Sequence, residues 1–187
     1  MLKVAKDYDF DIKFDMNKIS IFGCTGSGKS FVAGELSKIF DLPIIYFDHY
    51  TWNPDRSPID KNVFVEKILS MAGDKWIMDG NHSRDDELTK YRFTKSDLIV
   101  FLDFDEKDCV EAVKLRAGKA RPDIPDFLIE DADDTAWLIN HIKKWHIDKK
   151  PELILSQAKK YNANKRLVIL KNRKQVNDFL NTTKKEM

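Results

Sequence analysis

The chain has no long hydrophobic run and little cysteine, and each of these features argues against one class of protein. Its longest uninterrupted apolar stretch is Leu98–Leu102, far short of the roughly 20 residues that cross a bilayer as a helix. The first residues, MLKVAKD, lack the apolar segment of a secretory signal, so we expect a cytoplasmic protein without membrane contact. Two cysteines, Cys24 and Cys109, are too few for a disulfide framework. The chain's 42% hydrophobic and 34% charged residues are typical of a globular protein.

Acidic and basic residues are divided unevenly along the chain, although the net charge is only +1. Residues 141–187 carry 13 Lys/Arg against 4 Asp/Glu, whereas residues 1–140 carry 19 against 27. Such asymmetry can indicate a surface for polyanions. The basic residues are scattered rather than massed in one run. This pattern favours solvated helix faces, with nucleic acid as a less favoured partner.

One motif, at residues 23–30, carries most of the functional information. It reads G-C-T-G-S-G-K-S, which is the phosphate-binding loop (P-loop) pattern G-x-x-x-x-G-K-[ST]. A strand-like run precedes it at 18–22, and apolar residues at helical spacing follow it up to Asp41. This setting predicts a nucleotide site formed by Gly23, Gly26, Ser27, Gly28, Lys29 and Ser30. Lys29 is expected to reach the β- and γ-phosphates of ATP, and the Ser30 hydroxyl to bind Mg²⁺.

Further strand and helix patterns alternate along the chain. Buried-type strands are predicted at 18–22, 42–47, 75–78, 98–102 and 166–170, with helical periodicity between them. This alternation predicts an α/β fold with a parallel sheet, as a single domain over residues 1–187. Alternating polar and apolar residues at 7–16 predict an additional N-terminal edge strand.

Carboxylates follow three of the predicted strands directly. Ligands of parallel sheets bind at the carboxyl ends of the strands, so Asp48, Asp79 and Asp103 are candidate site residues. Asp48 is expected to bind the acceptor hydroxyl or take its proton. Asp79 and Asp103 compete for the role of ordering the water ligands of Mg²⁺, and spacing alone leaves that choice open. Each could instead be a turn residue.

Aromatic side chains follow Asp48 in the sequence. His49, Tyr50 and Trp52 could form an aromatic wall for a base, or they could anchor the core. The sequence does not separate these two interpretations.

A basic cluster precedes an acidic segment across Pro122. The cluster is Lys114, Arg116, Lys119 and Arg121, and six carboxylates lie within residues 123–134. We interpret residues 114–134 as a lid-like segment whose cations fold over the transferring phosphoryl group. The alternative is a solvated helix face that pairs with the acidic stretch 123–134. Without nucleotide either charged set can be solvated and neither must pack, so we expect the segment to be mobile, and polyphosphate is expected to draw it inward.

Several segments, taken in order, resemble a known family. After the P-loop come WIMDGN at 76–81, DLIVFLDF at 97–104, GKARPD at 118–123 and LVILKNR at 167–173. Over residues 18–180 the chain resembles the adenylate-kinase-related P-loop proteins often labelled DNA topology modulation proteins. The resemblance implies a three-layer P-loop nucleoside-triphosphatase fold of the nucleoside-monophosphate-kinase type, with strand order 2-3-1-4-5. It also implies that Asp79 serves the Mg²⁺ side and that Arg116 and Arg121 are lid arginines.

Three features depart from the family pattern. Residues 81–84 read NHSR where adenylate kinases have Phe-Pro-Arg, so the monophosphate site is altered. Residues 105–106 read DE where members often have Pro-Arg, and the segment 1–17 is extra.

Together these expectations favour a Mg²⁺-dependent phosphotransferase that moves the γ-phosphate of ATP to a small acceptor, with a nucleoside or nucleotide as a candidate. The predicted catalytic residues are Lys29, Asp48, Asp79, Arg116 and Arg121, and the predicted metal-binding residues are Ser30 and Asp79. Two alternatives stay open. One is a nucleotide-dependent regulator that associates with nucleic acid, and the other is a slow NTPase whose acceptor is water. Neither the acceptor nor the oligomeric state is specified by the sequence.

Overall fold

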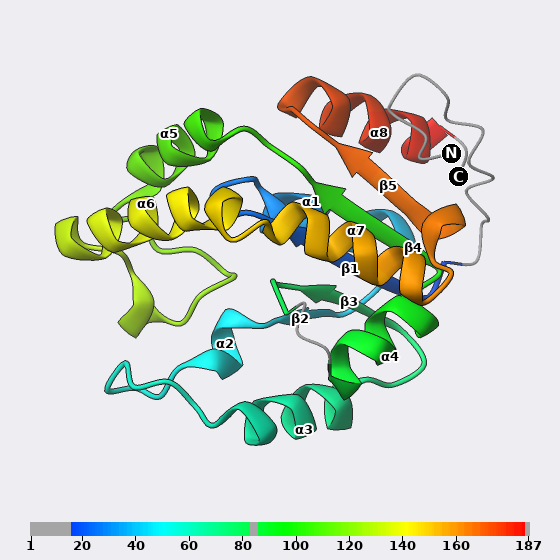
Figure 1. Cartoon of the computed structure of the whole chain (residues 1–187), viewed down its shortest axis with the longest axis horizontal. Helices are drawn as coiled ribbons and strands as arrows, with labels where there is room; N and C mark the ends of the chain where they lie inside the picture. The colour runs from blue at the N-terminus through cyan, green and yellow to red at the C-terminus, as the bar shows by residue number, and fades with distance from the viewer. Residues whose placement is uncertain (1–15, 83–85, 186–187) are drawn as a thin grey trace.

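The computed structural model describes residues 16–82 and 86–185, and a parallel β-sheet lies at its centre (Figure 1). The strands are β1 (Lys18–Gly23), β2 (Ile44–Tyr46), β3 (Trp76–Asp79), β4 (Leu98–Leu102) and β5 (Leu167–Leu170). They are ordered β2-β3-β1-β4-β5, and every neighbouring pair is parallel. The predicted α/β fold and strand order are therefore confirmed. The edge strand predicted at 7–16 lies outside the described residues, apart from its last position.

The strands are short apolar runs because helices cover both faces of the sheet. β4, with the sequence LIVFL, is buried along its whole length. Two helices, α1 (Lys29–Phe40) and α8 (Arg173–Lys185), pack against each other and against the sheet. Figure 1 shows α6 (Ala132–Ile147) and α7 (Lys150–Lys160) almost end to end in front of the sheet, with α1 behind it.

The remaining helices lie in the connections between the strands (Figure 1). They are α2 (Asp48–Thr51), α3 (Lys61–Met71), α4 (Glu87–Lys95), α5 (Glu106–Arg116) and the 3₁₀ turns η1 (Asp126–Leu128) and η2 (Asn164–Arg166). Side-chain caps define several starts. The Asp60 carboxylate accepts hydrogen bonds from two N–H groups at the start of α3, and Asp131 forms a capping box at the start of α6. Within the described residues, no helix is long and apolar enough to cross a membrane.

One charged side chain, Arg92 of α4, lies fully buried in the core. It donates hydrogen bonds to the carbonyl oxygens of Ile21 at 3.0 Å, Met78 at 3.2 Å and Gly80 at 2.9 Å. Its guanidinium carbon also lies 3.7 Å from the ring centroid of Phe22. Burial lowers the pKa of Arg92 to about 9, so the group stays charged at neutral pH. Arg92 thereby fixes the carboxyl ends of β1 and β3, the edge at which ligands of parallel sheets bind.

Candidate functional site

Residues 23–30 form a tight turn between β1 and α1, as the motif predicts. Gly26 and Gly28 have φ angles of 84° and 93°, in the left-handed region that glycine adopts without strain. A Cβ on Gly26 would lie 2.3 Å from the carbonyl oxygen of Cys109 in α5, so a larger residue does not fit. Because α1 begins at Lys29, the unpaired N–H groups of its first turn lie at this loop. The loop therefore has the backbone geometry of an anion-binding site.

The Lys29 ammonium group folds back onto the loop. Its Nζ donates to the carbonyl oxygen of Cys24 at 3.1 Å, and the Ser27 N–H donates to the same oxygen at 3.1 Å. Cys24 and Cys109 are both free thiols, buried in the core beneath this turn. The ammonium group of Lys29 therefore lies against the loop, where the motif predicts that phosphate binds.

Asp79 ends β3 beside the P-loop, and only 5% of it is exposed. Burial raises the pKa of Asp79 to about 6, and Lys29 and Ser30 oppose this rise. Its Oδ1 is buried and makes no hydrogen bond. A buried carboxylate oxygen without a donor fits a cation or an ordered water. Ser30 and Asp79 therefore fit the demands of a magnesium site.

This site has no protein cage for a metal. Among residues 16–82 and 86–185, no group of three or more His, Cys, Asp or Glu side chains could hold a metal ion by itself. Mg²⁺ that binds with a nucleotide needs no such group, because phosphate oxygens and waters take most of its coordination positions.

Asp48 begins α2 directly after β2, and its side chain is exposed. The surrounding protein raises the pKa of Asp48 by disfavouring its charged form, and nearby Asp123 adds to the rise. Lys29, Arg116 and Arg121 act in the opposite direction. Asp48 stands two residues after Tyr46, which is in register with Asp79 of β3, so the two carboxylates lie at the same edge of the sheet.

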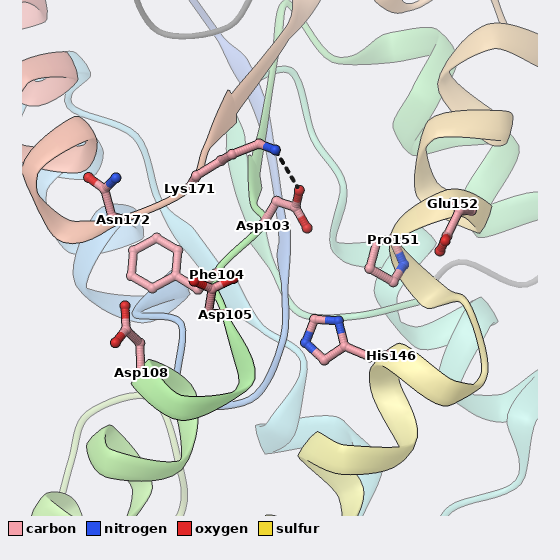
Figure 2. A pocket seen from close by; sticks show the side chains of 9 residues that line it. All are labelled: Asp103, Phe104, Asp105, Asp108, His146, Pro151, Glu152, Lys171 and Asn172. Carbon is pink, nitrogen blue, oxygen red and sulfur yellow. Dashed lines mark ion pairs between the residues drawn. The ribbon is translucent and has the colours of Figure 1, made fainter.

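Asp103 lies at a different place from the P-loop. It follows β4 and forms an ion pair with Lys171 at 3.9 Å (Figure 2). Together with His146 and Glu152, it lines a pocket of about 500 Å³ between the end of β5 and the junction of α6 and α7. The geometry therefore puts Asp79, and not Asp103, beside Lys29 and Ser30.

Arg116 and Arg121 converge on one buried carboxylate. Nη2 of Arg116 lies 2.9 Å from Oε1 of Glu130, and Nη2 of Arg121 lies 3.1 Å from the same oxygen. Arg121 also pairs with Asp123 at 3.4 Å. At these four residues the basic and acidic sets therefore pair with each other, as the alternative of a helix face paired with the acidic stretch expects. Partial burial makes unpaired charges costly, so the two sets neutralise each other. Of the remaining cations in the cluster, Lys114 stays exposed.

Residues 117–131, which we call the covering segment, run from α5 to α6 across the candidate site. The Ser30 hydroxyl donates to Oδ2 of Asp123 at 3.0 Å. On the other side, Nε2 of His49 lies 3.1 Å from the carbonyl oxygen of Pro122. The segment therefore contacts both the P-loop and the α2 side of the site.

Asn81 links the end of β3 to the P-loop. Its Oδ1 accepts a hydrogen bond from the Gly23 N–H at 2.9 Å, and its Nδ2 donates to the Gly23 carbonyl oxygen. The sequence prediction missed Asn81, Asp123 and Glu130 as members of the site. Asn81 and Asp123 stand in the segments WIMDGN and GKARPD, which carry the family resemblance, and that signal could have found them. Glu130 has no comparable local signal.

A second pocket, of about 670 Å³, adjoins the arginine side of the site. It extends from the outer face of α5 to the start of α8, and its lining includes Leu115, Arg116, Lys119, Asn172 and Arg173. Lys119 of the basic cluster thus faces this pocket rather than Glu130.

The comparisons with known proteins support the fold and show no family. No protein-family model matches the chain, and a search of curated proteins finds no match. The resemblance to the topology modulation proteins is therefore not confirmed.

Solved structures are similar across nearly the whole chain. A shikimate kinase from Bacteroides thetaiotaomicron has 15% identity and a TM-score of 0.53, with 92% of this chain and 98% of that chain covered. A gluconokinase from Sinorhizobium meliloti 1021 has 15% identity and a TM-score of 0.53, with 89% of each chain covered. A shikimate kinase from Acinetobacter baumannii, in complex with shikimate, has 14% identity and a TM-score of 0.54, with 90% of each chain covered. At such identities the similarity shows that the chain has a P-loop kinase fold.

Proposed function

We propose that this protein is a phosphotransferase that uses ATP and Mg²⁺ to phosphorylate a hydroxyl group of a small acceptor. The observation that supports the proposal is that Lys29, Ser30, Asp48 and Asp79 all follow or end the neighbouring strands β1, β2 and β3 at the carboxyl edge of the sheet. The kinase fold of the chain agrees with this chemistry.

The P-loop would bind the phosphates of ATP. Backbone N–H groups of residues 26–30 would donate to the β-phosphate, and Lys29 would exchange the Cys24 carbonyl for oxygens of the β- and γ-phosphates. The pocket beside Arg116 is continuous with the arginine side of the site and would take the ribose and base. Ser30 and Asp79 would hold Mg²⁺, which neutralises charge on the β- and γ-phosphate oxygens when bound.

Asp48 would act on the acceptor. Its carboxylate would accept the proton of the acceptor hydroxyl as that oxygen bonds to the γ-phosphorus. The bond from this phosphorus to the β–γ bridging oxygen breaks, and ADP leaves with the bridging oxygen. The raised pKa of Asp48 makes it a stronger base than an ordinary aspartate.

Arg116 and Arg121 would neutralise charge on the transferring phosphoryl group. Each uses Nη2 on Glu130, and Nε of Arg121 also pairs with Oδ1 of Asp123 at 3.4 Å. Since a guanidinium has five N–H donors, both arginines keep donors for phosphoryl oxygens.

Aromatic rings beside Asp48 support a nucleoside as the candidate acceptor. The rings of Tyr46 and His49 stack with centroids 5.8 Å apart, and Tyr50 lies next to His49 at 6.3 Å. Such rings offer a flat surface for a base next to the proposed proton acceptor.

Transfer of labelled phosphate tests the proposal. The protein is incubated with Mg²⁺ and ATP labelled at the γ-phosphate, together with separate pools of nucleosides, nucleotides, sugar acids and polyols. We expect label to appear in an organic acceptor from one pool, and chelation of Mg²⁺ to abolish the transfer. Label found only in inorganic phosphate with every pool would instead assign the protein as an NTPase.

A further inference from the structure

Three carboxylates from three different elements lie near Lys29 and Ser30 at the end of the P-loop. Asp48 begins α2, Asp79 ends β3, and Asp123 belongs to the covering segment. Asp123 makes the direct contact, since its Oδ2 accepts a hydrogen bond from the Ser30 hydroxyl at 3.0 Å. Only 12% of the Asp123 side chain is exposed.

The same place contains an acceptor oxygen with no donor. Oδ1 of Asp79 is buried and makes no hydrogen bond, although Asp79 adjoins Ser30. Buried polar atoms nearly always have a partner, so a buried carboxylate oxygen without a protein donor suits a cation or an ordered water. The position next to Ser30 therefore offers oxygen ligands from Asp79 and Asp123.

The spacing of Ser30 and Asp123 suits a shared metal ion. Mg²⁺ binds oxygens at about 2.0–2.1 Å in an octahedron, so neighbouring ligands lie about 2.9 Å apart. The measured separation of Ser30 Oγ and Asp123 Oδ2 is 3.0 Å. Both oxygens could bind one Mg²⁺ with little movement of either side chain.

We propose that Asp123 is a further metal-binding residue, which brings the covering segment to the Mg²⁺ held by Ser30 and Asp79. The inference rests on the proposed function, because Mg²⁺ arrives there with the nucleotide. Asp123 stands only two residues after Arg121. A metal that binds Asp123 therefore also positions Arg121 toward the phosphates. Closure of the segment is in this way linked to the metal as well as to the phosphate charge.

A different role for the same contact makes the opposite prediction. If Asp123 only accepts the Ser30 hydrogen bond and must be displaced by the metal, its removal should strengthen metal binding. If Asp123 is a ligand, its removal should weaken metal binding. The sign of the effect separates the two roles.

The test compares Asp123→Asn with Asp126→Asn, a matched control. Asp126 lies in the same segment, and its side chain is exposed. Mn²⁺ serves as the probe, and its binding is followed by electron paramagnetic resonance with a non-hydrolysable ATP analogue present. Affinity for the analogue in chelator, without metal, is measured in parallel. Circular dichroism and thermal unfolding show whether each variant is folded.

We expect Asp123→Asn to weaken Mn²⁺ binding at least ~10-fold, which is the usual effect of removing a group that supports a metal site. The affinity of this variant for the analogue in chelator should stay within about twofold of wild type. Asp126→Asn should match wild type in both measurements. Mn²⁺ binding by Asp123→Asn that is unchanged or tighter would overturn the proposal and leave the proposed function standing. Failure of the wild-type protein to bind the analogue at all would overturn both.

A second measurement uses only the wild-type protein and so does not depend on the variants folding. Hydrogen exchange in residues 117–131 is recorded with the analogue in chelator and with the analogue plus Mg²⁺. We expect most of the added protection to require Mg²⁺. Equal protection in both conditions would show that phosphate charge alone closes the segment, and Asp123 would then not be a ligand.

Discussion

At the scale of a single residue, Asp79 is subject to two opposing effects, because burial raises its pKa whereas Lys29 and Ser30 lower it. Its burial beside Lys29 raises its pKa to about 6, above the ordinary value of 3.8. The folded protein therefore binds the Asp79 proton more tightly than the unfolded chain does. The contribution of protonated Asp79 to the free energy of unfolding is complete below pH 4 and is lost as the pH rises through 6. At neutral pH the ionised carboxylate costs stability, and the proposed reason for its presence is the metal.

We predict that Asp79→Asn raises the free energy of unfolding of the ligand-free protein at pH 8 by about 1–3 kcal/mol, at ~1.4 kcal/mol per pKa unit. The difference should shrink to near zero toward pH 4, where the wild-type carboxylate is also neutral. The same variant should lose phosphoryl transfer. Urea unfolding of both proteins at pH 4, 6 and 8 measures the effect, with Asp126→Asn as an exposed control. A difference between wild type and variant that does not depend on pH would contradict this account of Asp79.

Asp48→Asn separates the acceptor side from the nucleotide side. Asp48 is exposed at the end of β2 and is not part of the P-loop. We expect the variant to bind Mg²⁺ and ATP within about twofold of wild type by calorimetry, and to lose ~10²–10⁴ in transfer rate, the typical contribution of a general base. A variant that transfers phosphate normally would reduce Asp48 to a turn residue.

How well a residue could be predicted depended on whether its signal is local. The P-loop residues and the carboxylates at strand ends could be proposed from the sequence because the motif and the strand-end rule need only adjacent residues. Arg92 looks like any charged residue of a polar helix, and its burial depends on carbonyls of β1 and β3. Glu130 meets Arg116 only because residues 117–131 reverse direction. Such long-range pairings have no sequence period from which to predict them.

At the scale of elements, the covering segment is the proposed lid, and in the structure it contacts both the P-loop and the α2 side of the site. It is held in the structure by the arginine pairs of Glu130, by the hydrogen bond from Ser30 to Asp123, and by Arg56, whose Nε donates to the carbonyl oxygen of Phe127 at 2.9 Å. These are polar contacts whose groups would return to water when the segment opens, whereas the sheet is held by buried apolar side chains. Opening of the segment should therefore cost less than opening of the sheet.

We predict that the amides of residues 114–134 exchange faster than those of β1 and β4 without nucleotide. A non-hydrolysable ATP analogue with Mg²⁺ should slow them, because polyphosphate binds the arginines only when the segment is closed. α7, which lines neither the P-loop nor the pocket beside Arg116, is the internal control and should not change. Protection that rises at residues 23–30 but stays flat across 114–134 would make the arginines part of an ordinary helix surface.

Elements were predicted where apolar periodicity is strong. All five strands lie close to the predicted positions, since each strand is an uninterrupted apolar run, and helices lie between them as the alternation predicts. Two of these helices, α2 and α4, have weak sequence signals for different reasons. α2 is a single turn that directly continues β2, and α4 has the polar sequence ELTKYRFTK, whose few buried residues give no clear stripe.

At the scale of the whole molecule, part of the basic charge of residues 141–187 is paired within the protein. Lys184 pairs with Glu35 of α1 at 2.8 Å, and Lys174 pairs with Asp178 at 2.6 Å. Arg166 is engaged with main-chain carbonyl oxygens. Several of these cations are thus paired or hydrogen-bonded within the protein, and they lie on different elements.

We therefore predict only weak, non-specific DNA binding, with a dissociation constant above about 10⁻⁶ M at physiological salt and a steep fall in affinity as salt rises. Fluorescence anisotropy with a labelled duplex, in the presence and absence of Mg²⁺ and ATP, measures this. Sub-micromolar binding that responds to Mg²⁺ and ATP would favour the nucleic-acid-associated regulator instead.

The central claim is that the P-loop lysine serves phosphoryl transfer from ATP. Its most direct test is the rate of ADP formation by Lys29→Ala, with each acceptor that the labelling screen identifies. Lys38→Ala is the control, because Lys38 lies on the same helix in an exposed ion pair with Glu35. We predict that Lys29→Ala keeps the wild-type fold by circular dichroism and loses ~10²–10³ in rate, as for loss of one preorganised charge partner, while Lys38→Ala keeps the wild-type rate. Unchanged ADP formation and unchanged ATP affinity in Lys29→Ala would contradict the account.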